Sequence, residues 1–191
     1  MPYTKQHKHN SKQRILKSAF QLFTANGFDG VTINKIMENC SLTRGAFYAH
    51  FSSKSMLYSE VVKYAATSSK LAELKSEGIT DKQWLTQLLD AYLSIEHVNG
   101  ERACPLAFLA TDIVTQDVDA RAAYCNAYMG MNKIILDYVN KFSSCNQQQV
   151  LAVTSMIIGA VAISRTIENS DEILLLLTSC REEVGKLLGG I

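Results

Sequence analysis

Apolar residues recur three and four positions apart along almost the whole chain, which is the period of an amphipathic α-helix. The first such run contains Ile15, Leu16, Ala19, Phe20 and Phe23, and Gly27 is placed to end it. No segment alternates apolar and polar residues as a β-strand does, and no internal repeat of useful period is present. The pattern therefore predicts an all-α protein.

Breaks between the apolar runs divide the chain into about nine predicted helices. Thr32 is suited to cap a short second helix, and a third short helix is expected over about 44–50. Pro105 suits the first turn of a later helix, and Gly78 marks the end of an earlier one. The longer helices are expected over about 53–77, 80–97, 104–115, 117–142, 147–169 and 171–188.

Charge is distributed unevenly along the chain. The net charge of the whole is only +1, but residues 1–57 carry eight basic and two acidic side chains, a net charge of +6. The remainder has a net charge of −5. A basic front end on a near-neutral protein indicates a polyanionic partner for that end, although a solvated lysine-rich segment has the same charge.

The five cysteines are odd in number and widely spaced, which predicts neither a disulfide framework nor a zinc site. We therefore expect a reduced, cytoplasmic protein with no metal and no cofactor. The most apolar runs, at about 150–163 and 173–177, are too short or too interrupted to span a bilayer, so no membrane partner is expected.

Residues 27–54 are the most informative stretch. Two short helices joined by a tight turn fit a helix-turn-helix, whose second helix enters a DNA major groove. A small core can form from Ile36, Leu42, Phe47 and Phe51. Arg44, at the exposed start of the second helix, can pair with a guanine, and Gly45 lets the backbone approach DNA. The candidate contacts to bases or phosphates are Thr32, Thr43, Arg44, Gly45, Tyr48, His50 and Lys54.

The order of residues in this stretch closely resembles the DNA-binding domain of the TetR family of bacterial regulators. The matching residues are Phe23, Gly27, Phe28, Thr32, Ile36, Thr43, Arg44, Gly45, Phe47, Tyr48, His50, Phe51, Ser53 and Lys54. The resemblance covers about residues 11–58. Two positions depart from the family pattern: Ser41 replaces a glycine and is expected to adopt a left-handed backbone, and Ala49 removes one candidate phosphate contact.

The resemblance implies an N-terminal three-helix DNA-binding domain over 1–56 and a larger helical effector-binding and dimerisation domain over 57–191. It also implies a repressor that binds a palindromic operator in double-stranded DNA as a dimer. A small effector then moves the helix that begins near Ser53, which changes the separation of the two recognition helices and releases the DNA.

Aromatic and apolar residues recur every four positions on two of the later predicted helices. Such residues suit a pocket for a small, mostly hydrophobic effector, although they equally suit a plain helical core. The candidate pocket residues are Trp84, Leu88, Tyr92, Cys104, Phe108, Tyr124, Tyr128 and Met131.

Cys104 supports an alternative, a repressor that senses oxidants or electrophiles. It is expected near a helix N-terminus beside Arg102, where the helix dipole and the guanidinium favour the thiolate. Some TetR-like regulators look similar around this helix start. Against this hypothesis, most cysteines are buried and inert.

The last two predicted helices carry small and branched apolar residues that allow close helix packing. The resemblance implies that they pair with their symmetry mates in a four-helix bundle, the alternative being burial within their own subunit. A two-fold dimer is favoured because a single DNA-binding domain of this size makes too few base contacts for sequence specificity. The candidate dimer contacts are Ile157, Val161, Ile173, Leu177, Val184 and Leu188.

An enzyme and a non-enzymatic interaction module are two other classes of function for an all-α chain. The sequence has no clustered acid, base or nucleophile and no glycine-rich phosphate loop, so we do not expect an enzyme. A non-enzymatic helical interaction module with an incidental basic end is the other hypothesis. Salt-dependent DNA binding with a sequence preference separates it from a regulator.

Overall fold

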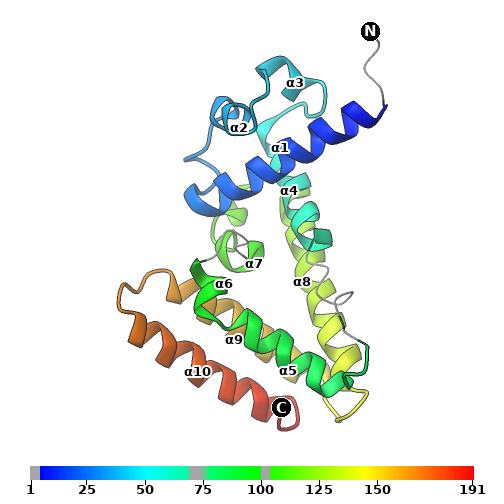
Figure 1. Cartoon of the computed structure of the whole chain (residues 1–191), viewed down its shortest axis with the longest axis vertical. Coiled ribbons are helices and arrows are strands. Elements are labelled where there is room, and N and C mark those ends of the chain that lie inside the picture. The colour runs from blue at the N-terminus through cyan, green and yellow to red at the C-terminus, as the bar shows by residue number, and fades with distance from the viewer. Residues whose placement is uncertain (1–4, 69–74, 76, 100–103) are drawn as a thin grey trace. The chain divides into compact units, whose positions relative to one another are not determined.

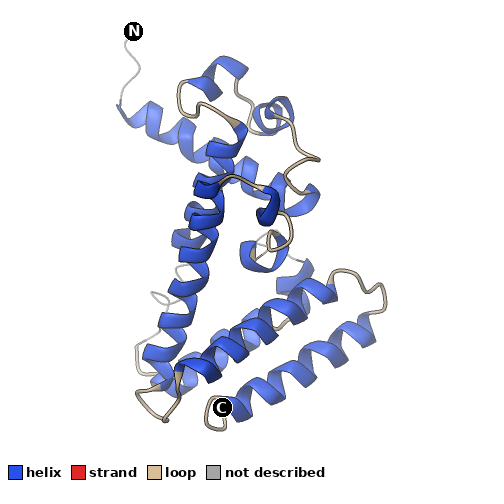
Figure 2. Cartoon of the chain, turned by 180° about the vertical axis from the view of Figure 1, so that it is seen from behind, coloured by secondary structure: helices blue, strands red, loops and turns tan. Residues whose placement is uncertain are grey.

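The structure is a computed structural model that describes residues 5–68, 75, 77–99 and 104–191. All regular structure within these residues is helical, as Figure 2 shows, so the all-α prediction is confirmed. In chain order (Figure 1) the elements are α1 (Lys5–Asn26), α2 (Ile33–Asn39), α3 (Arg44–Tyr48), α4 (Lys54–Ser68), α5 (Asp81–Tyr92), α6 (Ile95–Asn99), α7 (Pro105–Phe108), the 3-10 turn η2 (Ile113–Thr115), α8 (Val118–Val139), α9 (Gln147–Ser164) and α10 (Ser170–Leu187).

Three predicted helices are wrong in their extent. The helix expected over 147–169 ends at Ser164. The helix expected over 80–97 is two helices, because the Ser94 hydroxyl donates to the Ala91 carbonyl and accepts from the His97 N–H, which starts α6 afresh. The helix expected over 104–115 stops at Phe108 and resumes only as η2, where Thr115 donates to the Asp112 carbonyl. The split at Ser94 gives ten α-helices in the described residues instead of nine.

Several expectations fall outside the described residues. They are the continuation of the fourth helix through 69–74 and 76, the turn at Gly100 and the placement of Arg102 next to Cys104.

The chain packs as two compact units. The first contains the described residues of 5–68 together with Phe108–Ala127, and the second contains those of 75–107 together with Tyr128–Ile191. Helix α8 therefore contributes residues to both units. The functional boundary predicted between residues 56 and 57 falls inside α4, all of which belongs to the first unit.

The first unit is built around one hydrophobic core. Phe23 of α1, Phe47 of α3 and Tyr58 of α4 are fully buried in it, and the Phe23 and Tyr58 rings meet edge to face at 4.9 Å. The expected small core is confirmed, with Ile36, Phe47 and Phe51 buried and Leu42 partly buried against them. The later segment completes this core with Leu109, Ile113, Ala120 and Ala123.

In the second unit α9 and α10 lie side by side (Figure 1). Asn146 and Gln149 form a capping box at the start of α9, and Asn169 caps α10. One buried polar group joins α9 to α8: the Thr154 hydroxyl lies 2.8 Å from Asn132 Oδ1 and 3.2 Å from the Tyr128 hydroxyl.

Among the described residues, only α9 is long and apolar enough to cross a membrane by length and composition. Its buried positions, which include Val150, Val153 and Ile157, recur at helical spacing, as they do in the core helix of a globular protein.

Candidate nucleic-acid interface

The turn between α2 and α3 has the backbone that a helix-turn-helix requires. Thr32 caps α2 by accepting from the Lys35 N–H, as expected. At the far end, Ser41 has a φ of 50°, which confirms the predicted left-handed residue. The Ser41 N–H donates to the Glu38 carbonyl and the Leu42 N–H to the Met37 carbonyl, so the turn is closed by the end of α2.

Helix α1 fixes α2 and the turn through three polar contacts. The Arg14 guanidinium donates to the Cys40 carbonyl at 2.6 Å, and the Ser18 hydroxyl donates to the Ile36 carbonyl at 2.8 Å. Asn39 Nδ2 in turn donates to the Ser18 oxygen at 3.0 Å. These contacts hold the end of α2 rigidly, so α3 is presented from a fixed base.

The exposed face of α3 carries the candidate base contacts. Arg44, Gly45 and Tyr48 are exposed, whereas Phe47 on the other face is fully buried. The Arg44 guanidinium lies 6.0 Å from the centre of the Tyr48 ring. A Cβ at Gly45 would meet only the Thr43 hydroxyl, at 3.9 Å, so nothing inside the fold requires glycine there. Close approach of DNA to Gly45 stays a prediction.

His50 lies at the end of the turn after α3 and contacts α1. Its Nε2 is 2.8 Å from the Ser11 hydroxyl, and that hydroxyl donates its single proton to the Lys8 carbonyl. With the Ser11 proton on the Lys8 carbonyl, the matching tautomer of His50 carries its proton on Nε2 and leaves Nδ1 free to accept one. Burial, followed by the charges of Lys8 and Lys12, lowers the pKa of His50 below its usual range.

Two lysines near His50 were missed in the sequence analysis. Lys8 is exposed on the second turn of α1, and Lys12 pairs with Glu60 at 3.1 Å while its ammonium lies 5.7 Å from the Phe51 ring. The sequence indicates that these lysines lie near His50 only through their positions beside Ser11 on α1, and the contact of Ser11 with His50 is itself seen only in the structure. They extend the basic surface from α3 onto α1.

Lys54 has internal contacts. Its ammonium donates to the carbonyls of Phe28 at 2.9 Å and Val31 at 3.0 Å, and lies 3.9 Å from the centre of the Phe28 ring. Two of its three N–H groups thus hold the loop between α1 and α2. A phosphate contact by Lys54 stays a prediction.

A sequence model described as "Bacterial regulatory proteins, tetR family" matches residues 15–61, which are α1 from Ile15, the helix-turn-helix and the first half of α4. Residues 15–61 therefore form a DNA-binding domain of the TetR family.

Curated relatives named as HTH-type transcriptional regulators are also similar to this chain. "HTH-type transcriptional regulator AcrR" of Shigella flexneri is 36% identical over 74 residues, 39% of this chain and 34% of that protein. "Uncharacterized HTH-type transcriptional regulator YerO" of Bacillus subtilis is 25% identical over 130 residues, 66% of this chain. This chain spans only 44% of YerO. "HTH-type transcriptional regulator LmrA" of Bacillus subtilis is 26% identical over 183 residues, 90% of this chain and 94% of that one.

Solved structures share the whole fold. The structure titled "Crystal structure of E.coli NemR reduced form" has a TM-score of 0.79 at 16% identity and covers 93% of this chain and 96% of its own. The structure of a regulator titled as a TetR/AcrR family member has a TM-score of 0.78 at 19% identity and covers 94% of this chain and 99% of its own. At these identities the likeness establishes the TetR fold, an N-terminal helix-turn-helix followed by a helical domain.

The eight candidate pocket residues are divided between the two units. Phe108 and Tyr124 belong to the first, where Tyr124 packs against the core of the DNA-binding helices. The other six belong to the second unit, with Trp84, Tyr92 and Cys104 buried and Leu88, Tyr128 and Met131 half-buried.

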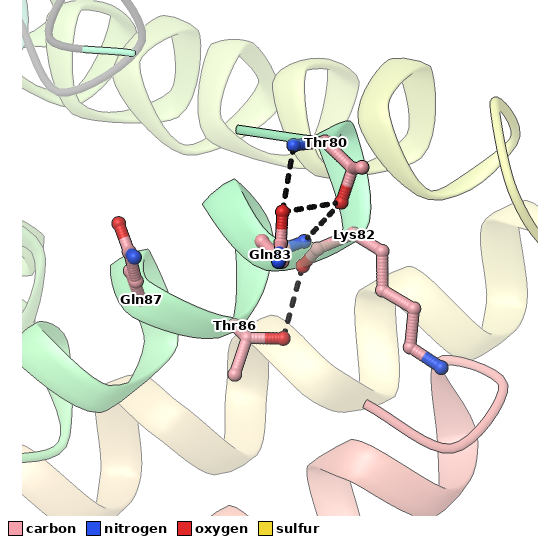
Figure 3. Close-up of a pocket in the computed structure, with 5 residues that line it drawn as sticks. All are labelled: Thr80, Lys82, Gln83, Thr86 and Gln87. Atoms are coloured by element: carbon pink, nitrogen blue, oxygen red, sulfur yellow. Dashed lines mark hydrogen bonds between the residues drawn. The ribbon is translucent and has the colours of Figure 1, made fainter. Parts of the chain in front are cut away.

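One open hollow in the part of the chain that the structure describes lies at the start of α5, and no candidate pocket residue lines it (Figure 3). Its lining is Thr80, Lys82, Gln83, Thr86 and Gln87. The Thr80 N–H donates to Gln83 Oε1 and the Gln83 N–H to the Thr80 hydroxyl, so these polar groups cap the helix. Within the same described residues, no group of three histidine, cysteine or carboxylate side chains is placed to hold a metal.

The six candidate dimer contacts are all buried within the chain itself. This corresponds to the alternative considered above, burial in their own subunit. The exposed large apolar residues on α9 and α10 are instead Ile163, Leu174 and Leu175, and Leu175 retains 68% of its surface. Any partner helix would therefore meet these three side chains first.

Proposed function

We propose that this TetR-family chain is a transcriptional repressor that reads a palindromic DNA operator through α3. The observation that carries the proposal is the exposed face of Arg44, Gly45 and Tyr48, backed by the buried Phe47 and fixed by α1. An arginine at a rigid helix start is suited to bidentate pairing with a guanine. AcnR of Corynebacterium glutamicum is named a transcriptional repressor and IcaR of Staphylococcus aureus a negative transcriptional regulator, which supports repression over activation.

The phosphate-contacting part of the interface is proposed to include Thr32, Thr43, His50 and Lys8. Thr32 and Thr43 are exposed at the starts of α2 and α3. Lys8 adds a cation next to His50, and such contacts give affinity without sequence preference.

We propose that the functional unit is a cytoplasmic homodimer joined through α9 and α10. The exposed Ile163, Leu174 and Leu175 supply apolar surface on these helices, and the six candidate contacts beneath them give that surface a packed base. Two copies of α3 then read two half-sites about one DNA turn apart.

The effector is proposed to be a small, mostly apolar molecule bound in the second unit among Trp84, Leu88, Tyr92, Tyr128 and Met131. In the described residues, the Trp84 indole N–H and His97 Nε2 are buried without a protein partner. Buried polar atoms need partners, so these two are suited to orient a polar group on the effector.

The arrangement around Cys104 favours non-covalent sensing over the cysteine-sensor alternative. The Cys104 sulfur is buried and lies 2.8 Å from the Tyr92 hydroxyl. Burial raises the pKa of its thiol, which opposes the thiolate that oxidants and electrophiles attack. Equal loss of DNA binding after alkylation of wild type and Cys104→Ser would exclude a role for this sulfur.

The test is selection of duplexes from a random-sequence pool, followed by titration of the selected duplex at several salt concentrations. We expect a palindromic consensus, salt-dependent affinity and a loss of about tenfold or more for Arg44→Ala. Arg121→Ala, an exposed arginine on α8, is the matched control and should bind as wild type. Binding that ignores sequence at every salt concentration would favour the interaction-module hypothesis.

A further inference from the structure

A carboxylate distant in sequence holds the loop that leads into the helix-turn-helix. Gly27 ends α1 with a φ of 68°, and its N–H donates to the Phe23 carbonyl, which closes the helix with a single bond. The next N–H, of Phe28, is left without a helix carbonyl and donates to the Asp112 carboxylate. A Cβ at Gly27 would lie 3.2 and 3.4 Å from the two carboxylate oxygens, so Asp112 packs directly against the glycine.

The same loop residue is held from its other side. The Phe28 carbonyl accepts from Lys54 of α4, and the Phe28 ring packs edge to face on Tyr58 with 5.1 Å between centres. The Lys54 ammonium also donates to the carbonyl of Val31, the residue before Thr32, which caps α2. The direction in which α2 leaves the loop is therefore set by Asp112 and Lys54 together.

Tyr58 gives a second sign that the Asp112 carboxylate is built into this core. The side chain of Tyr58 is fully buried, and burial first, then the nearby charge of Asp112, raise the pKa of its hydroxyl. Neighbours of Asp112 are themselves core residues, because Leu109 and Ile113 are buried in the same cluster as Tyr58.

Asp112 belongs to the stretch of chain that joins the first unit to the second. Residues 108–127 enter the first unit after Ala107 and leave it at Ala127, and α8 continues to Val139 with residues of the second unit. A change at either end of this stretch is thus covalently connected to the carboxylate that holds Phe28.

We propose that Asp112 is the positioning residue that links the effector-binding part to the helix-turn-helix. While its carboxylate holds the Phe28 N–H, α2 and α3 keep the orientation that fits DNA. Displacement of residues 108–127 withdraws the carboxylate and frees the loop. This inference rests on the proposed function. It adds a second connection to the helix-turn-helix beside the expected movement of α4, since Lys54 of α4 and Asp112 both bond to Phe28.

Operator DNA serves as the probe, because coupling between two sites is reciprocal. Hydrogen exchange is followed by mass spectrometry on the full-length protein, with and without the duplex selected by the wild type. In the wild type we expect DNA to slow exchange both in α3 and in the part of α8 beyond Ala127. In Asp112→Ala, peptides containing Phe28 should exchange about tenfold or more faster without DNA, since a bond to a charged acceptor is lost.

The deciding comparison is the response remote from the DNA. At duplex concentrations that saturate each variant, we expect Asp112→Ala to keep the protection of α3 and lose most of that in α8. Asp119→Ala, which removes an exposed carboxylate on the same stretch, should match wild type. Asp112→Asn keeps the shape and one acceptor oxygen, and it should fold and show a weakened remote response. An unchanged remote response in both Asp112 variants overturns this inference alone. Absence of DNA protection in wild-type α3 overturns the proposed function and this inference together.

Discussion

Lys54 gives the sharpest prediction because its sequence-derived role and its observed contacts differ. The sequence pattern makes it a candidate phosphate contact, whereas the structure engages its ammonium with two loop carbonyls and an aromatic ring. Lys54→Met removes the ammonium and keeps the length of the aliphatic stem. Three contributions to the stability of the first unit are then lost at once.

Their size follows from the geometry. The side chain is half-buried, so water can replace part of each lost bond, and each charge-assisted bond contributes about 1 kcal/mol net rather than the full value of a buried one. The ammonium above the Phe28 ring adds roughly 0.5–1 kcal/mol. Since methionine retains the packing of the stem, we expect Lys54→Met to lower the free energy of unfolding by about 2–3 kcal/mol.

Urea unfolding followed by far-UV circular dichroism, at one protein concentration, measures this loss. The matched control is Lys63→Met on the same helix. The Lys63 side chain is 58% exposed where it pairs with Glu60, so this pair should contribute about 0.5 kcal/mol or less. Titrating the selected duplex against salt measures the other role. A fall of about one per protomer in the salt slope, with stability unchanged within about 0.5 kcal/mol, would refute the structural role and restore Lys54 as a phosphate contact.

Three further predictions concern the interface and the dimer. Lys8→Ala should lower the salt slope of operator binding by about one per protomer, whereas Lys133→Ala on α8 should not; equal slopes would remove Lys8 from the interface. Operator affinity should rise as the pH falls from about 7.5 to about 6. Burial and two lysines hold the pKa of His50 down in the free protein and a phosphate raises it in the complex, so binding takes up a proton. His50→Gln should flatten this pH dependence while His7 and His9 remain as internal controls, and an unchanged profile would contradict the assignment. Leu175→Glu should give a monomer in analytical ultracentrifugation, whereas the exposed Ser179→Glu should remain dimeric; a dimeric Leu175→Glu would argue against this face.

The parts of the fold that the sequence predicts are those coded locally. Thr32 as a cap, Gly27 as a helix end and Ser41 as a left-handed residue each depend on neighbours within four positions, and all three are confirmed. The break at Ser94 is local too, but a serine inside an apolar run gives only a weak signal. The helix-turn-helix could be predicted because the residues that determine its geometry lie within a stretch of about thirty residues.

Contacts between distant residues could not be predicted in this way. The bond from Phe28 to Asp112 spans 84 residues, and that from His50 to Ser11 spans 39. Apolar periodicity marks a residue as buried without saying what covers it. For Ile157 and Leu177 the pattern therefore leaves open a partner subunit or their own chain, and in the structure their own chain buries them.

The location of Asp112 bears on how the reading and sensing parts depend on each other. The Phe28 N–H, which follows the bond that ends α1 at Gly27, donates to the Asp112 carboxylate and not to a helix carbonyl. Tyr58, Leu109 and Ile113, which complete the core around Phe23, also lie outside residues 1–56. The helix-turn-helix is thus completed by a segment that arrives more than fifty residues later. In the proposed coupling, residues 108–127 set the orientation of the helix-turn-helix before any effector binds, and an effector that moves this segment would change DNA binding.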